Sequence, residues 1–155
     1  MLRKITMAEE TTYLTSEGKE ELEQKLKRLQ EMERPALAQK LKEAVAMGDL
    51  KENADYHDTR EKMSLMDGEI MRLENILRTA AIIENDGSTD EVLLGSTVTI
   101  CEEGFDEEEI YTIVGQAEAN PRDGKISQKS PIGAALLHRR KGDKVKVDTP
   151  NGKMK

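Results

Sequence analysis

The stretch Met47-Gly48-Asp49-Leu50-Lys51-Glu52-Asn53 decides the fold of the first half of the chain, because it is a short turn between two helical stripes. Before the turn, apolar residues recur at intervals of three, four or eight along one helix face: Leu22, Leu26, Leu29, Leu37, Leu41 and Ala44. After it, two series repeat every seven residues, as in a coiled-coil seam: Tyr56, Met63, Ile70 and Leu77, and Thr59, Met66, Leu73 and Ala80. Gly48 suits the position just after a helix end, where the backbone often adopts the left-handed conformation. The sequence therefore predicts an antiparallel helical hairpin with its tip near residues 47–55.

The first arm of this hairpin has a predicted start and a predicted irregularity. Thr15 is a suitable N-cap, and Glu17 then lies in the first turn. Pro35 removes a backbone donor inside the stripe, so we predict a bend there rather than an end. Arms of roughly 30 residues at 1.5 Å per residue give a rod of about 45 Å. Heptad repeats of this kind more commonly indicate a structural or dimerising coiled coil, and this alternative stays open.

The second half of the chain has strand character. Residues 92–100 and 109–114 are β-branched and alternate, which predicts two strands. Pro131 at a first helical position predicts a short helix through Leu137, followed by a turn at 141–143 and a strand over 144–149. We therefore predict an α+β protein with a helical hairpin domain, 1–81, and an antiparallel β-sheet domain with one short helix, 82–155. Only three residues follow the turn signal 150–152, so we expect an exposed sheet edge near Val147.

Composition limits the classes of function. The formal net charge of −7 argues against tight independent binding of nucleic acid, because phosphate binding needs a surplus of Lys and Arg. The charge is uneven, however, with ten Lys or Arg against three Asp from Arg122 onward and six acids among the eight residues 102–109. The single cysteine, Cys101, permits no intrachain disulfide and suggests a reducing cytoplasm. We expect no membrane association, because no apolar run approaches the ~20 residues of a bilayer span.

The acids of the turn are the candidate chemical groups, and each has an ordinary structural explanation as well. Asp49 followed three residues later by Glu52 is an acidic form of the capping box, which satisfies the amides at the start of a helix. Asp55 falls in the first helical turn, where an acid interacts favourably with the helix dipole. Tyr56 begins the second seam, where packing is its default role, and Asn53 is expected to be a turn residue.

From Gly48 to Tyr56 the chain resembles the tip of the GreA and GreB transcript cleavage factors. Three other segments match this family in the same order: Leu14-Thr15-Ser16-Glu17-Gly18, Arg34-Pro35 and Ile126-Ser127-Gln128-Lys129-Ser130-Pro131-Ile132. The matches cover roughly residues 13–152, nearly the whole chain. The resemblance implies a coiled-coil N-terminal domain and an FKBP-like α+β C-terminal domain.

The resemblance also implies a function and partners. Factors of this family bind bacterial RNA polymerase at its secondary channel and stimulate cleavage of the nascent RNA 3′ end in backtracked complexes. The polymerase cuts the RNA, so the factor itself is not an enzyme. Asp49 and Glu52 would help to hold a second Mg²⁺ in the polymerase active centre, with Asp55 and Tyr56 supporting the tip. We expect a monomer. We also expect the isolated protein to bind no Mg²⁺ tightly, because one or two carboxylates can complete a site shared with polymerase but cannot form a full Mg²⁺ site by themselves.

Other family positions are matched in part. Arg60 corresponds to a basic patch that contacts the extruded RNA, whereas Val45 stands where many relatives of the GreA branch carry an Arg. Lys129, Ser130, Pro131 and Ile132 match the segment that docks on polymerase, although Ser130 and Pro131 are also ordinary helix-capping residues. Two alternative functions stay open: a homologous factor that blocks the channel and inhibits transcription, and a structural coiled-coil interaction module.

Overall fold

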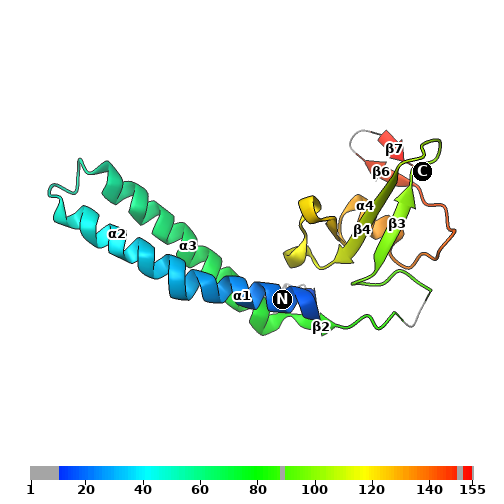
Figure 1. Ribbon diagram of the computed structural model, residues 1–155, viewed down its shortest axis with the longest axis horizontal. Helices are drawn as coiled ribbons and strands as arrows, with labels where there is room; N and C mark the ends of the chain where they lie inside the picture. The colour runs from blue at the N-terminus through cyan, green and yellow to red at the C-terminus, as the bar shows by residue number, and fades with distance from the viewer. Residues whose placement is uncertain (1–10, 88–89, 150–151, 155) are drawn as a thin grey trace, which may run out of the picture. The chain divides into compact units, whose positions relative to one another are not determined.

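The computed structural model describes residues 11–87, 90–149 and 152–154 (Figure 1). The chain divides into two compact units, which are described separately below. The helical unit comprises 17–78, and the β unit comprises the chain from Thr79 onward together with the segment before Glu17. The sequence prediction places the boundary after residue 81, whereas β1 and β2 both fall within the β unit.

The helical unit is a hairpin of two long arms (Figure 1). The first arm consists of α1 (Ser16–Arg28), the π-helical turn η1 (Leu29–Glu33) and α2 (Arg34–Ala46) without a break. The second arm is α3 (Ala54–Thr79). The fold class predicted from the sequence, a helical hairpin followed by a β domain, is confirmed.

The π-helical turn explains why the first stripe contains a spacing of eight. Leu22 and Leu29 are seven residues apart, as are Leu37 and Ala44, but Leu29 and Leu37 are separated by eight. In η1 the N–H of Arg34 donates to the carbonyl oxygen of Leu29, five residues earlier, so this turn contains one residue more than an α-helical turn. Both halves of the arm therefore keep their apolar stripe on the buried side, and the arm continues through Pro35 as predicted.

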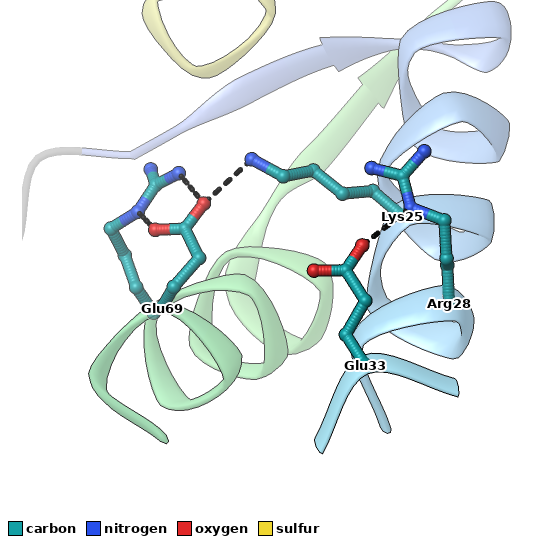
Figure 2. A network of polar contacts seen from close by, with 5 residues as sticks. Lys25, Arg28, Glu33 and Glu69 are labelled. Atoms are coloured by element: carbon teal, nitrogen blue, oxygen red, sulfur yellow. Dashed lines mark hydrogen bonds and ion pairs between the residues drawn. The ribbon is translucent and has the colours of Figure 1, made fainter. Parts of the chain in front are cut away.

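The predicted seam faces inward along the whole of α3. Thr59, Ile70 and Leu73 are buried, and the other four seam positions within α3 are half-buried. Polar contacts join the arms beside the seam, at Lys25–Glu69, Gln30–Glu74 and Arg34–Asp67. Figure 2 shows Lys25 of the first arm reaching Glu69 of the second, and nearby the pair Arg28–Glu33 within the first arm.

The β unit contains a three-stranded sheet in the order β3 (Thr97–Cys101), β4 (Glu108–Val114) and β5 (Lys125–Ser127). β3 and β4 are antiparallel, as predicted, but β4 and β5 are parallel, so the sheet is mixed and not antiparallel throughout. Two 3₁₀ turns, η2 (Gln116–Glu118) and η3 (Pro121–Asp123), carry the chain back between β4 and β5. The short helix α4 (Pro131–Leu136) contributes Leu136 to a core that it shares with Leu94, Ile113 and Ile126.

Two short strand pairs complete the β unit. β1 (Tyr13–Thr15) lies parallel to β2 (Ala81–Ile83), and the buried carboxylate of Glu118 accepts hydrogen bonds from the N–H and the hydroxyl of Thr15. β6 (Val147–Thr149) turns back into β7 (Gly152–Met154). The expected exposed edge near Val147 is therefore wrong, because Val147 pairs with Met154 and is buried.

Two strands are shorter than predicted, whereas the strand predicted over 109–114 is confirmed as β4. β3 begins at Thr97 rather than at 92, because the segment before it forms a turn in which the N–H of Ser96 donates to the carbonyl oxygen of Leu93. β6 likewise begins at Val147 rather than at 144. No helix among the described residues has the length and apolar character needed to cross a bilayer.

Candidate functional site

The tip of the hairpin is a seven-residue connection between α2 and α3. The helix α2 ends at Ala46, and the N–H of Met47 donates to the carbonyl oxygen of Ala44 at 3.2 Å. Gly48 follows with a φ of 120°, which a residue with a side chain rarely adopts. The predicted helix-ending role of Gly48 is confirmed.

Asn53 holds the two helix ends together. Its side-chain oxygen accepts a hydrogen bond from the N–H of Tyr56 at 3.0 Å, which makes Asn53 the N-cap of α3. Its side-chain nitrogen donates to the carbonyl oxygen of Ala44 at 2.7 Å, at the end of α2. The alternative explanation of Asp49 and Glu52 as a capping box is therefore wrong, because Asn53 occupies the capping position. The sequence contained a signal for this, since Asn is among the best N-cap residues, but Asp49 offered the same signal four residues earlier.

Asp49 and Glu52 are both exposed on the turn. One carboxylate oxygen of Asp49 accepts a hydrogen bond from the N–H of Lys51 at 3.0 Å, which shapes the turn. Within the described part of the chain, the Glu52 carboxylate has no hydrogen bond or ion pair. The fold therefore uses one oxygen of Asp49 and leaves Glu52 available.

The chemistry of these two groups suits a hard cation, but only as part of a larger site. Carboxylate oxygens are the ligands that Mg²⁺ prefers, and this ion usually keeps several waters. The described residues contain no group of three His, Cys, Asp or Glu side chains placed to hold a metal. Asp49 and Glu52 can thus supply part of a Mg²⁺ site whose other ligands come from elsewhere.

The other predicted tip residues lie on the first two turns of α3. Asp55 is exposed in the first turn. Tyr56 is half-buried, and its ring is edge-on to the His57 ring, with 5.4 Å between the ring centroids. The Tyr56 hydroxyl accepts a weak hydrogen bond from the Arg60 guanidinium at 3.5 Å. The structure thus brings Tyr56 and Arg60 together next to the acids of the turn.

The cations near the tip differ in how they are engaged. Lys62 donates to Asp58 at 2.7 Å, and this hydrogen bond, together with the charge of Asp58, raises the pKa of Lys62. Arg60 has no carboxylate partner among the described residues. On the other arm, Val45 is 46% exposed. Arg60 and Lys51 are therefore cations near the tip that have no carboxylate partner among the described residues and remain available for an external anion.

The predicted docking segment lies at the start of α4, in the β unit. The Ser130 hydroxyl accepts from the N–H of Gly133 at 3.0 Å and donates to the carbonyl oxygen of Ser127 at 2.7 Å, so its capping role is confirmed. Ile132 is half-buried against the core. Lys129 and Pro131 are exposed. The segment therefore presents Lys129 and Pro131 outward on a turn that Ser130 holds.

Two family models match the chain in succession. One, described as the N-terminal region of a transcription elongation factor, matches residues 12–82, and the other, described as the C-terminal region of the transcription elongation factors GreA/GreB, matches 87–155. A protein of Chloroflexus aggregans named transcription elongation factor GreA is 47% identical over 150 residues, covering 96% of each chain. A protein of the same name from Bacillus velezensis is 46% identical over 149 residues, covering 96% of this chain and 95% of its own. Among solved structures, GreA factor homolog 1 of Thermus thermophilus is 34% identical, covers 93% of this chain and 94% of that chain, and has a TM-score of 0.46.

Proposed function

Because the chain belongs to the GreA/GreB family of transcription elongation factors, we propose that it binds bacterial RNA polymerase and stimulates RNA cleavage in backtracked complexes. In this proposal the β unit docks at the rim of the secondary channel, and the hairpin tip reaches the active centre through the channel. The factor acts as a monomer in the cytoplasm and contacts the nascent RNA 3′ end only within the complex. The polymerase active site cuts the RNA, and the factor is an accessory.

The observation that carries the proposal is the role of Asn53. A tip whose acids capped α3 would have to give up helix stability before those acids could bind anything else. In this protein Asn53 makes the capping hydrogen bonds, and Glu52 has no partner within the described residues. The acids can therefore act as ligands without unwinding the helix.

Asp49 and Glu52 would hold one Mg²⁺ jointly with ligands from polymerase. When bound there, this ion would supply the charge stabilisation of a two-metal phosphodiester cleavage. The Lys51 N–H fixes one Asp49 oxygen, which orients the carboxylate, and the second oxygen has no hydrogen bond among the described residues. Asp55 would add negative charge to the tip, and Tyr56 would support it through its contact with Arg60.

Arg60 and the docking segment would provide the other contacts. The Arg60 guanidinium, which lacks a carboxylate partner among the described residues, would bind a phosphate of the extruded RNA. Lys129 and Pro131 would contact polymerase, while Ser130 and Ile132 would hold the docking segment in shape. These contacts are few, in keeping with a protein that is acidic overall and binds RNA only together with polymerase.

A cleavage assay on defined backtracked complexes tests the proposal. Polymerase is incubated alone, with the wild-type factor, or with Asp49→Asn, Glu52→Gln or the control Glu61→Gln, an exposed acid of α3 that is not part of the turn. We expect the wild type and the control to accelerate cleavage. Each tip variant should reduce the stimulated rate by at least about tenfold, because it removes a charged metal ligand.

Two results would contradict the proposal. Equal stimulation by the wild type and both tip variants would exclude a role for these acids. A wild-type factor that slows elongation without stimulating cleavage would instead identify the channel-blocking class. Sedimentation of the free factor completes the test, because a stable dimer would favour the coiled-coil interaction module.

A further inference from the structure

Gly68 lies in the middle of α3, on the side of the helix that points away from the first arm. The inward seam residues Met66 and Ile70 are each two positions away, which is a rotation of about 200° around the helix. Gly68 is exposed, and a Cβ added to it would meet nothing within 4 Å among the described residues. Glycine destabilises a helix interior relative to alanine. No contact among the described residues therefore requires a glycine at this position.

The residues around Gly68 include two large apolar side chains that stand in solvent. On a helix surface the neighbours of a residue lie three and four positions away, which for Gly68 are Ser64, Leu65, Met71 and Arg72. These four residues and Gly68 are here called the Gly68 face. Leu65 and Met71 are each 69% exposed. Because Gly68 has no side chain, the space between Leu65 and Met71 is open to a group from outside the chain.

The charge of the Gly68 face distinguishes a protein from RNA as its partner. Arg72 is the charged member of the face, and its guanidinium donates to both carboxylate oxygens of Glu69, at 2.8 and 2.9 Å. An RNA phosphate binds best to a cation that is free of such a partner. The other members are apolar, apart from the neutral Ser64. The Gly68 face therefore favours an apolar group of a protein over a phosphate of the RNA.

The helical backbone beneath the Gly68 face favours another helix as the partner element. The N–H and C=O groups of α3 are bonded within the helix, so an extended chain would find no backbone partners there. Helices pack by inserting side chains between residues three and four positions apart on the opposite helix. The missing side chain of Gly68 makes room for a large one. A second copy crossing at its own Gly68 would leave this room unfilled.

We propose that the Gly68 face packs against a helix of RNA polymerase, which inserts one large apolar side chain over Gly68 between Leu65 and Met71. Gly68 lies about 21 Å along α3 from the start of the helix, at 1.5 Å per residue. A hairpin whose tip reaches the active centre through the channel carries this face into the channel. The inference therefore rests on the proposed function, and it identifies the side of the hairpin that contacts the channel wall.

The affinity of the full chain for bacterial core RNA polymerase tests the proposal. The Kd is measured by fluorescence anisotropy with a labelled factor, separately from any cleavage assay. We expect Gly68→Leu to raise the Kd by at least about tenfold, because the added side chain fills the space that the polymerase side chain would take. The matched control is Ala36→Leu, which adds the same side chain at an exposed position of α2 and should bind like the wild type.

The stability of the same variants separates a contact with polymerase from a role in folding. Gly68→Leu should raise the midpoint of thermal unfolding by about 2 °C, because leucine favours a helix over glycine and meets no neighbour at this position. Leu65→Ala and Met71→Ala keep the helix propensity, and each should raise the Kd by about fivefold or more with little change in the midpoint. A variant that is more stable and yet binds polymerase less tightly cannot be explained by misfolding.

The outcomes distinguish this inference from the proposed function. A wild type that binds no polymerase would overturn both, whereas equal Kd values for Gly68→Leu and the wild type would overturn this inference alone. The expected differences in Kd without any stimulation of cleavage would support the Gly68 face and contradict the proposed function. A photocrosslinking residue at position 71 should label a polymerase subunit. Labelling of the nascent RNA, or a wild-type dimer that Gly68→Leu dissociates, would assign the face to another partner and overturn the proposal.

Discussion

Asn53 is the residue on which the geometry of the tip depends. It spans the two helix ends with one side chain, accepting from the Tyr56 N–H and donating to the Ala44 carbonyl oxygen. A turn that has two helix ends to satisfy normally uses several polar groups. Because the Asn53 amide bonds to both helix ends, Asp49 accepts only the hydrogen bond from the Lys51 N–H, and Glu52 has no partner among the described residues.

Replacing Asn53 should destabilise the hairpin more than replacing either acid. Asn53→Ala loses the cap and the bond to Ala44, which we expect to lower the free energy of unfolding by about 1–2 kcal/mol. Asn53→Asp keeps an acceptor for the Tyr56 N–H and loses only the donor, so its effect should be smaller. Thermal unfolding followed by circular dichroism measures both. A tip in which Asp49→Asn or Glu52→Gln costs as much as Asn53→Ala would contradict this division of roles.

The sequence located the tip residues but did not assign their structural roles. Asp49 and Asn53 are both good N-cap residues, and the local pattern does not distinguish them. The choice depends on the carbonyl oxygen of Ala44, which lies nine residues earlier and meets Asn53 only after the chain has reversed. The functional assignment of Asp49 and Glu52 came from the family resemblance, and it stays a prediction.

The Glu69 side chain of the second arm binds a side chain of the first arm. It accepts from Arg72 on its own helix and from Lys25 of α1 at 2.7 Å (Figure 2). These hydrogen bonds, Arg72 first and then Lys25, lower the pKa of Glu69 from 4.5 to about 2. The folded-state pKa is below the unfolded value, so the stabilisation is complete above pH 4.5 and is lost as the pH falls toward 2.

The variant Glu69→Gln tests this linkage. At pH 7 we expect it to lower the free energy of unfolding by about 1 kcal/mol, since solvent screens a partly exposed pair. The difference from the wild type should shrink as the pH falls from 4.5 toward 2. Urea unfolding over this pH range measures it, with Glu61→Gln as the control. A difference that does not depend on pH would mean that packing, and not charge, is responsible.

At the scale of elements, the π-helical turn reconciles an irregular sequence with a regular seam. The extra residue between Leu29 and Leu37 would turn the second half of the arm away from α3 by about 100° in an uninterrupted α-helix. The π turn absorbs that residue immediately before Pro35, whose ring would otherwise clash with the carbonyl oxygen of Glu31. One local irregularity thus accommodates both features.

Deleting an exposed residue of the π turn should reveal this coupling. Deletion of Met32 restores a spacing of seven but leaves Pro35 inside an uninterrupted helix, which we expect to cost about 3 kcal/mol. Combining the deletion with Pro35→Ala should recover most of that loss. Pro35→Ala alone should keep the π turn, because the spacing of eight remains. Thermal unfolding ranks the variants, and equal stability of the single deletion and the combined variant would contradict the account.

The elements were predictable where the pattern is periodic and local. The α3 seam repeats every seven residues without interruption, and its predicted positions within the helix are all buried or half-buried. The parallel pairing of β4 and β5 was missed, because strand direction depends on the 3₁₀ turns that lie between them. The β6–β7 hairpin was missed for another reason, since β7 is only three residues long and its pattern is too short to read.

At the scale of the whole molecule, the proposed activity divides between two units. The helical unit carries Asp49 and Glu52 at the end of the hairpin farthest from its connections to the β unit, and the β unit carries the docking segment. Neither unit contains a complete metal site among the described residues. The central claim is therefore that the tip completes a Mg²⁺ site only together with polymerase.

The Mg²⁺ dependence of RNA cleavage in a backtracked polymerase complex tests this claim most directly. The rate is measured as a function of Mg²⁺ concentration for polymerase alone, with the wild-type factor and with Glu52→Gln. We expect the wild type to lower the Mg²⁺ concentration for half-maximal cleavage by about tenfold or more, and Glu52→Gln to return it close to the value for polymerase alone. The same half-maximal concentration under all three conditions, with only the maximal rate changed, would contradict the account.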